Sequence, residues 1–398
     1  MMNKSKLTLF FILFFLHSIC INIIHPVTTD YVGSLNLPVY YFGFFFSLMS
    51  LGQVIGAFLF GFLSDKIGRK WLIVLGIIGY GLAQLGFGFI NTYPLLILFF
   101  RVIAGIFVSA PNTLFISMCL DNSNKDVKVK MLSILSFCSI LGASLGYKIG
   151  GSLYDDLHFS FGDIFISQFS LCIITSLILA IFMKDIVRTK AKEVTQKEAN
   201  NQTNTFKINH SIVILLIGLL VLTIGQILIS KYLDTYIIQI GNTASTLGDY
   251  VFITGIVGGI SNLVIIPFIK KIKTKFYSYL LISFVLISSL LTFITFSSGE
   301  NIMIFLYTTH MIYCVFKSII TPLEQNELST YSNSNSNGKL MGIRQTLLSI
   351  GNVVGPLLGS LIYSEGNPLV FIISGFIIFL SFIIYLIYYL TKKRKVVQ

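Results

Sequence analysis

Long apolar runs separated by short polar breaks dominate the sequence. A helix that spans a membrane needs about 20 mainly apolar residues, and runs of that length recur from one end of the chain to the other. Transmembrane β-strands would alternate apolar and polar residues over about ten positions, but runs such as SGFIIFLSFIIYLIYYL show no alternation. The pattern predicts an all-α membrane protein with twelve spanning helices, at residues 7–28, 39–61, 71–90, 94–117, 131–153, 163–183, 211–234, 247–269, 277–297, 301–323, 342–363 and 368–390.

The first apolar run follows Lys4 and Lys6, which is the order of charges in a secretory signal. It is longer than the usual signal core, and no small-x-small cleavage site follows it. We therefore expect an uncleaved first span.

Composition and charge agree with this prediction. Hydrophobic residues make up 55% of the chain and charged residues 11%, and the net charge is +12. With the N-terminus inside, Lys and Arg gather in the predicted cytoplasmic stretches, so the positive-inside rule predicts that both termini are cytoplasmic. The basic balance therefore reflects orientation in the membrane, and nucleic acid is not an expected partner. The other basic residues lie inside predicted spans: Arg101, Lys148, Lys231 and Lys317.

The longest polar segment divides the twelve spans into six and six. We predict an N-terminal bundle over residues 1–184, a cytoplasmic linker over 185–210, and a C-terminal bundle with a short basic cytoplasmic tail over 211–398. Aligning Gly146 with Gly355 requires almost the same offset as aligning Pro111 with Pro322, which indicates a duplication. Two repeated six-helix bundles around a midplane site are typical of secondary transporters that work by alternating access.

The break between spans two and three reads GFLSDKIGRK and contains Gly61, Asp65, Gly68, Arg69 and Lys70. It resembles the loop signature of the major facilitator superfamily, which implies a conformational gate at the cytoplasmic face. Glycines at two of these positions allow a tight turn and close helix approach, and the aspartate can pair with a base or cap a helix end. The alternative is a basic loop that only sets topology.

Span five reads GASLGYKIGG and resembles the antiporter motif of the same superfamily, except that Tyr147 stands where the family has a proline. Span eleven carries the proline version. We expect both glycine faces to pack closely against neighbouring helices, and packing through small residues is also common in membranes without any transport role. The residues concerned are Gly142, Gly146, Gly150, Gly151, Gly351, Gly355, Pro356 and Gly359.

Arg101 lies within span four, where the family often has an arginine associated with proton coupling. A charge in the membrane costs at least about 2.5 kcal/mol, so we expect it to face a cavity and an acid partner, with Asp30 or Asp163 as candidates. The alternative is an arginine that reaches outward to the membrane surface.

Further groups could couple protons or bind substrate. His17 and His310 are candidate proton relays, although a membrane histidine is as often a hydrogen-bonded packing residue. The remaining candidates are acids: Asp30, which is also a candidate partner of Arg101, and Asp234 and Glu324, with Glu327 nearby.

The nearest resemblance within the superfamily is to the twelve-span drug-proton antiporters of Gram-positive bacteria, which implies proton-coupled efflux of hydrophobic or amphipathic small molecules across the cell membrane. The alternative is a dedicated exporter or importer of one polar metabolite such as a sugar, an amino acid or a metal-chelating acid. A cationic substrate would favour Asp30 and Asp234, and an anionic one the four bases within spans. No GxSxG, HExxH or GxxxxGK[ST] motif is present, and the five cysteines show no CxxC spacing. We therefore expect neither an enzyme nor a chain that uses ATP, a metal or another cofactor.

Overall fold

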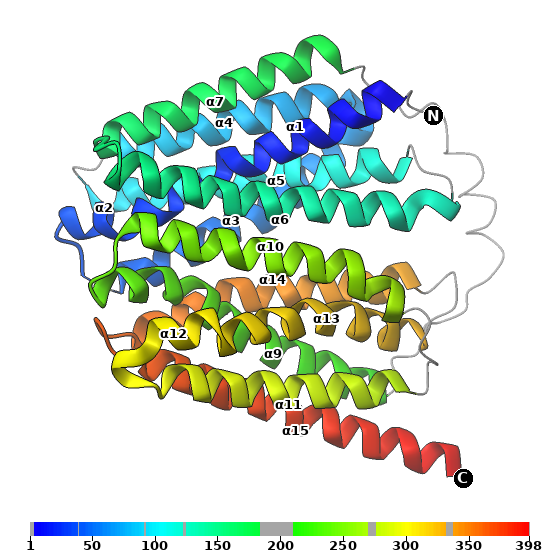
Figure 1. Cartoon of the computed structure of the whole chain (residues 1–398). Coiled ribbons are helices and arrows are strands. Elements are labelled where there is room, and N and C mark those ends of the chain that lie inside the picture. The colour runs from blue at the N-terminus through cyan, green and yellow to red at the C-terminus, as the bar shows by residue number, and fades with distance from the viewer. Residues whose placement is uncertain are drawn as a thin grey trace.

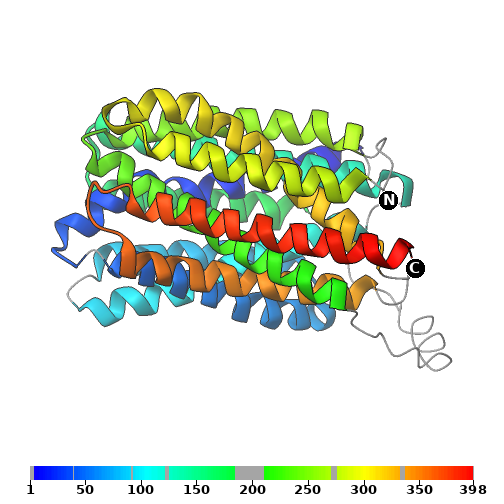
Figure 2. The same ribbon diagram turned by 90° about the horizontal axis from the view of Figure 1, so that it is seen from below.

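The computed structural model describes residues 4–38, 40–90, 93–121, 125–183, 210–269, 276–331 and 337–397. Every regular element within these ranges is a helix, and the long helices run side by side (Figure 1). Figures 1 and 2 both place the two chain termini at the same end of the molecule. We call this the terminal end and the opposite one the far end.

The first six predicted spans correspond to helices in the first half of the chain. Their bounds are α1 (Lys4–Asn22), η1 (His25–Val27), α2 (Thr28–Ser34), α3 (Tyr41–Ile67), α4 (Lys70–Phe89), α5 (Pro94–Asp121), α6 (Lys125–Asp155) and α7 (Phe161–Phe182).

The second half repeats this succession of spans. Its helices are α9 (His210–Gln239), α10 (Ala244–Ile269), α11 (Tyr277–Phe296), η3 (Gly299–Asn301), α12 (Ile302–Tyr307), α13 (Thr309–Ser329), α14 (Asn337–Ile362) and α15 (Leu369–Val397). Among the described residues, 11 helices are long and apolar enough to cross a membrane. The other predicted span is α10, a helix of 26 residues. The predicted all-α membrane fold is confirmed.

Each half buries its own apolar core. Side chains such as Leu228, Tyr313 and Tyr385 form one continuous core in the second half. Ile77 and Leu114 belong to a core in the first half, and a further cluster lies toward its far end. In Figure 1 the helices of the first half lie above those of the second half.

Several helix ends differ from the predicted ones. Span one continues to Ser34, because the chain kinks through η1 at Pro26, which has no amide hydrogen to donate, and resumes as α2. Span ten consists of two helices, α12 and α13, which are interrupted at Thr308 (φ −115°, ψ −82°). The predicted linker lies outside the described residues, apart from His210, which begins α9.

Two pairs of helices provide most of the contact between the two halves. Helix α6 packs along α10, and α3 packs along α14 (Figure 1). The Ser47 hydroxyl of α3 donates to the Val353 carbonyl of α14 at 2.7 Å, and the Thr29 hydroxyl of α2 donates to that of Thr235 in α9 at 3.3 Å. A Cβ on Gly248 of α10 would lie 2.7 Å from the Tyr147 carbonyl oxygen of α6. These residues lie toward the far end, where the halves are closed against each other.

Candidate substrate and coupling site

A partly buried hydrogen bond joins the two halves between the middle of the molecule and its far end. The Tyr147 hydroxyl of α6 donates to Asp234 Oδ2 of α9 at 2.7 Å. The Tyr147 ring stacks on His25, with 5.5 Å between centroids and 13° between planes. The missing proline of span five is thus replaced by a side chain that connects the first half to a carboxylate of the second.

Lys231 and Lys317 lie close to this bond. At 1.5 Å per residue, Lys231 is about 12 Å from the far end of α9, and Lys317 is about 18 Å from the terminal end of α13. A hydrocarbon layer is about 30 Å thick, so both are near its middle. Lys231 interacts electrostatically with Lys317, Arg101 and Asp234. Three bases and one acid therefore share this region.

Arg101 does not form the expected ion pair. Its guanidinium carbon lies 3.7 Å from the centroid of the Phe87 ring and 5.8 Å from that of Phe45. Arg101 is 2% exposed, so it does not reach outward either. Neither Asp30 nor Asp163 forms an ion pair with Arg101. Asp163 instead accepts hydrogen bonds from Ser160 in a capping box at the start of α7. Cation–π contact with a ring face takes the place of the acid.

The other predicted proton carriers form no hydrogen bond or ion pair with Asp234 in the described part of the chain, although His310 interacts electrostatically with Lys317. His17 is buried inside the first half and hydrogen-bonds Asn112 Oδ1 at 3.3 Å, as a packing histidine would. His310 Nδ1 hydrogen-bonds the Tyr250 hydroxyl, and its ring stacks on Tyr313 at 5.0 Å. Asp30 lies on α2, near Asp155 of α6.

The far end carries acid–base contacts between the halves that the sequence did not reveal. Lys148 of α6 forms an ion pair with Asp249 of α10. Nearer the far end, Asp155 accepts a hydrogen bond from the Ser245 amide, and Asp156 accepts one from the Ser245 hydroxyl. The side chains of the ion pair are 38% and 45% exposed, so the pair contributes at most about 1 kcal/mol. It favours one alignment of the two helices more than it holds them together.

The predicted gate lies at the terminal end. Gly68 has φ 89°, a conformation that favours glycine, and Arg69 and Lys70 begin α4 directly after it. The expected close approach at Gly61 is not present in this conformation, because a Cβ there would meet nothing within 4 Å. Asp65 belongs to the last turn of α3, but its side chain lies outside the described residues.

Apart from Gly151, the predicted glycines pack against helices of their own halves. Cβ atoms on Gly142 and Gly146 would lie 2.6 and 2.8 Å from carbonyl oxygens of α1, and one on Gly150 would clash with the Ile23 carbonyl. Gly351, Gly355 and Gly359 of α14 face α9, where a Cβ would meet the side chains of Thr223, Ile227 and Tyr232. Gly151 faces α10, and the Pro356 carbonyl accepts from the Tyr232 hydroxyl at 2.7 Å.

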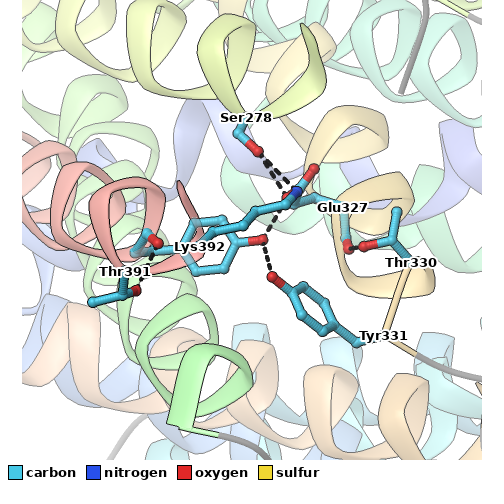
Figure 3. Close-up of polar contacts among 7 residues, drawn as sticks. Ser278, Glu327, Thr330, Tyr331, Thr391 and Lys392 are labelled. Carbon is cyan, nitrogen blue, oxygen red and sulfur yellow. Dashed lines mark hydrogen bonds and ion pairs between the residues drawn. The ribbon is translucent and has the colours of Figure 1, made fainter. Parts of the chain in front are cut away.

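Two buried acids occupy the terminal end of the second half. Glu324 pairs with Arg344 of α14 at 3.1 Å, which provides the partner that the sequence did not. Glu327, which is 0% exposed, pairs with Lys392 of α15 and accepts from Ser278 Oγ of α11 at 2.8 Å (Figure 3). It also accepts from the Tyr388 hydroxyl. These contacts link four helices of one half.

Hydroxyl directions in this cluster follow from the donors present. Tyr388 donates to Glu327, so the 2.7 Å contact between the Tyr331 and Tyr388 hydroxyls has Tyr331 as its donor. Burial raises the pKa of the Tyr331 phenol, which keeps that proton in place.

Sequence reasoning did not identify His25 or Asp249, and it assigned no partner to Tyr147. Only the position of Tyr147, where a proline was expected, was a signal. No group of three or more His, Cys, Asp or Glu side chains among the described residues could hold a metal ion.

The arrangement can be compared with known proteins. A family model described as Major Facilitator Superfamily matches residues 10–316 and 279–398. Multidrug resistance protein 1 of Bacillus subtilis (strain 168) is 26% identical over 375 residues, which cover 91% of this chain and 91% of that protein. Tetracycline resistance protein, class B, of Escherichia coli is 27% identical over 336 residues, covering 83% and 80%.

A solved structure shares the fold. The bacterial homologue of the human lysosomal transporter Spinster, in an inward-facing and occupied conformation, superposes with a TM-score of 0.76 at 11% sequence identity. The match covers 97% of this chain and 96% of that chain.

Proposed function

Because this chain belongs to the major facilitator superfamily and is a multi-pass membrane transporter rather than an enzyme, we propose that it exports hydrophobic or amphipathic small molecules in exchange for protons. The two halves, divided at the predicted linker, rock against each other around the region of Lys231, Asp234 and Lys317. The relatives named for multidrug and tetracycline resistance support efflux as the direction.

The membrane is the bacterial cell membrane, and the terminal end faces the cytoplasm. The support for this orientation is the positive-inside rule, since basic residues crowd the breaks at that end. The far end is then the outer face, and its closure corresponds to the inward-facing conformation. The predicted gate around Gly68 would close the opposite face in the outward-facing conformation.

The observation that carries the proposal is the hydrogen bond between Tyr147 and Asp234. An ionised Asp234 accepts a charge-assisted bond from Tyr147, and this bond favours closure of the outer face. An empty, deprotonated transporter is therefore held inward-facing until substrate binding separates the two halves.

Protonation completes the cycle. With the outer face open, Asp234 is exposed to the external medium and takes up a proton. In the open state the carboxylate is hydrated, and the cost of burying it opposes closure, whereas the neutral carboxyl group costs less to bury, so the outer face closes with the proton bound. The proton then leaves toward the cytoplasm, and the bond from Tyr147 holds the ionised Asp234 in the closed state. Lys231, one turn before Asp234, attracts the carboxylate and so favours release of the proton.

Efflux of ethidium and of 8-anilinonaphthalene-1-sulfonate from energised cells tests this proposal, because the two dyes are an organic cation and an organic anion. We expect a protonophore to abolish efflux by the wild-type protein, and we expect Asp234→Asn to lose proton-driven efflux while still exchanging substrate for substrate in proteoliposomes. Asp163→Asn is the matched control, because Asp163 caps α7 away from the site. Protonophore-resistant efflux, or normal proton-driven efflux by Asp234→Asn, would show that the proposal is wrong.

The second candidate is a dedicated transporter of one polar metabolite. Lys231 and Lys317 favour it, because such a substrate would need polar partners at this depth. A substrate profile restricted to one compound distinguishes it from broad efflux.

A further inference from the structure

Two lysines near the centre of the molecule have no acid partner. Lys231 of α9 and Lys317 of α13 form none of the ion pairs or hydrogen bonds within the described parts of the chain. A charge in a membrane interior is costly, and here the two ammonium groups interact unfavourably with each other as well. Arg101 adds a third positive charge to the same region.

The nearby carboxylates are engaged elsewhere. Asp249 pairs with Lys148, and Glu324 pairs with Arg344. Asp234 attracts Lys231 but is not in contact with it, and its Oδ2 accepts the bond from Tyr147. One acid therefore faces three bases, and the region has an excess of positive charge even when Asp234 is ionised.

Both lysines remain partly accessible although they lie deep within the protein. The Lys231 ammonium lies 4.9 Å from the centroid of the Phe46 ring, which belongs to α3 of the other half. Lys317 lies one turn after Tyr313 and Cys314 on α13. A molecule that reaches these ammonium groups would therefore have aromatic and apolar surface beside it.

We propose that the exported compound is an amphipathic organic anion whose carboxylate, sulfonate or phosphate group lies between Lys231 and Lys317. The inference rests on the proposed function and specifies its substrate class. The anionic group supplies the charge that the protein lacks, and the apolar body packs against rings such as Phe46. A small inorganic anion would satisfy only the first of these requirements.

The test uses the full-length protein in lipid nanodiscs and saturation binding of naphthalene-2-sulfonate. Naphthalene-2-sulfonamide is its neutral analogue of the same shape, 2-naphthyltrimethylammonium is a cation on the same ring, and sodium sulfate supplies the inorganic anion alone. We expect the sulfonate to bind, and unlabelled sulfonate to compete far better than the other three. Each of Lys231→Gln and Lys317→Gln should weaken binding by about tenfold or more, the loss expected for a charge-assisted contact.

Lys6→Gln is the matched control, because Lys6 is exposed at the start of α1 and should leave binding unchanged. Equal binding of the sulfonamide, preference for the cation, absence of saturable sulfonate binding by folded protein, or full binding by the Lys231→Gln/Lys317→Gln variant would each overturn the inference. Competition by sulfate as strong as that by the sulfonate would assign the lysines to an inorganic anion instead.

Binding needs no proton gradient, so this outcome is independent of the function test. Sulfonate binding without proton-driven efflux would leave the anion site standing and refute the coupling. Proton-driven efflux of ethidium without sulfonate binding would do the reverse.

Discussion

Tyr147 shows how a single departure from a family pattern can change what a helix does. A proline at this position would bend α6, whereas the tyrosine leaves the helix continuous and extends a hydroxyl to Asp234 across the interface. The proposed coupling between protonation and closure depends on that hydroxyl, because no other hydrogen bond to Asp234 is formed within the described part of the chain.

Tyr147→Phe therefore isolates the contribution of one hydrogen bond. We expect substrate-induced proton movement in proteoliposomes to fall by about tenfold or more, because a hydrogen bond to a charged group is worth about 1.5–3 kcal/mol. The thermal midpoint should change little, because the ring still stacks on His25. Tyr154→Phe makes the same chemical change on the same helix, where the ring stacks on Phe161, and should have no effect. Normal proton movement in Tyr147→Phe would show that the hydrogen bond to Asp234 does not control closure of the outer face.

Glu327 differs from Asp234 in that all its partners belong to one half of the molecule (Figure 3). We infer that it stabilises the second bundle instead of switching between states. Lys392→Ala should lower the stability of the protein by about 1–3 kcal/mol, because a buried carboxylate would lose its only cationic partner among the described residues. Thermal unfolding in detergent measures the loss.

A companion variant distinguishes charge from packing at this cluster. Glu327→Gln combined with Lys392→Met removes both charges while keeping similar volumes, and it should recover most of the stability lost in Lys392→Ala. If the double variant is as unstable as Lys392→Ala, the ion pair is not the cause.

Among the helices, the same contact appears in both halves: a glycine face of the fifth span packs on the first span of its bundle, α6 on α1 and α14 on α9. The α6 glycines approach carbonyl oxygens and the α14 glycines approach side chains of α9, and both contacts leave little room for a Cβ. Gly150→Ala would place a methyl group against the Ile23 carbonyl, so we expect reduced stability and reduced transport together.

Gly258→Ala is the matched control for this substitution. Gly258 also lies inside a helix, α10, but its Cβ would meet nothing within 4 Å. Its thermal midpoint should stay unchanged or rise slightly, because alanine favours helix over glycine by roughly 1 kcal/mol. Equal effects of the two substitutions would show that close packing at Gly150 is not what matters.

The apolar pattern was sufficient to predict the spanning helices, because a membrane imposes both their length and their composition. It did not predict the interruption at Thr308 or the continuation of span one to Ser34, since both depend on how neighbouring helices pack. It also placed Asp65 in a loop, although the backbone there completes the last turn of α3.

Contacts between the halves were beyond sequence reasoning. Tyr147 and Asp234, or Lys148 and Asp249, lie in different halves of the chain and meet only where the halves pack together, which no local sequence pattern predicts. The prediction that Arg101 has an acid partner was wrong for a related reason. An aromatic ring can stabilise a buried guanidinium, and an uncharged ring cannot be recognised as its partner from the pattern of charges in the sequence.

At the scale of the whole molecule, the substrate charge decides how the transporter uses the membrane potential. One elementary charge moved through 100 mV is worth about 2.3 kcal/mol. Exchange of one outgoing anion for one incoming proton moves two charges in the favourable direction, whereas exchange of a monovalent cation for a proton moves none. An excess of positive charge around Lys231 and Lys317 therefore implies an electrogenic cycle.

Steady-state gradients of 8-anilinonaphthalene-1-sulfonate across proteoliposomes can test this, with a potassium diffusion potential and no pH difference. Each charge that moves changes the equilibrium concentration ratio about tenfold for each ~59 mV, and exchange of one proton for one anion moves two charges. The ratio of outside to inside concentration should therefore change about a hundredfold for each ~59 mV, inside negative. The Lys231→Gln/Lys317→Gln variant should show no protein-dependent gradient. A single factor of ten would indicate uncoupled anion movement, and a ratio independent of the potential would contradict exchange of an anion for a proton.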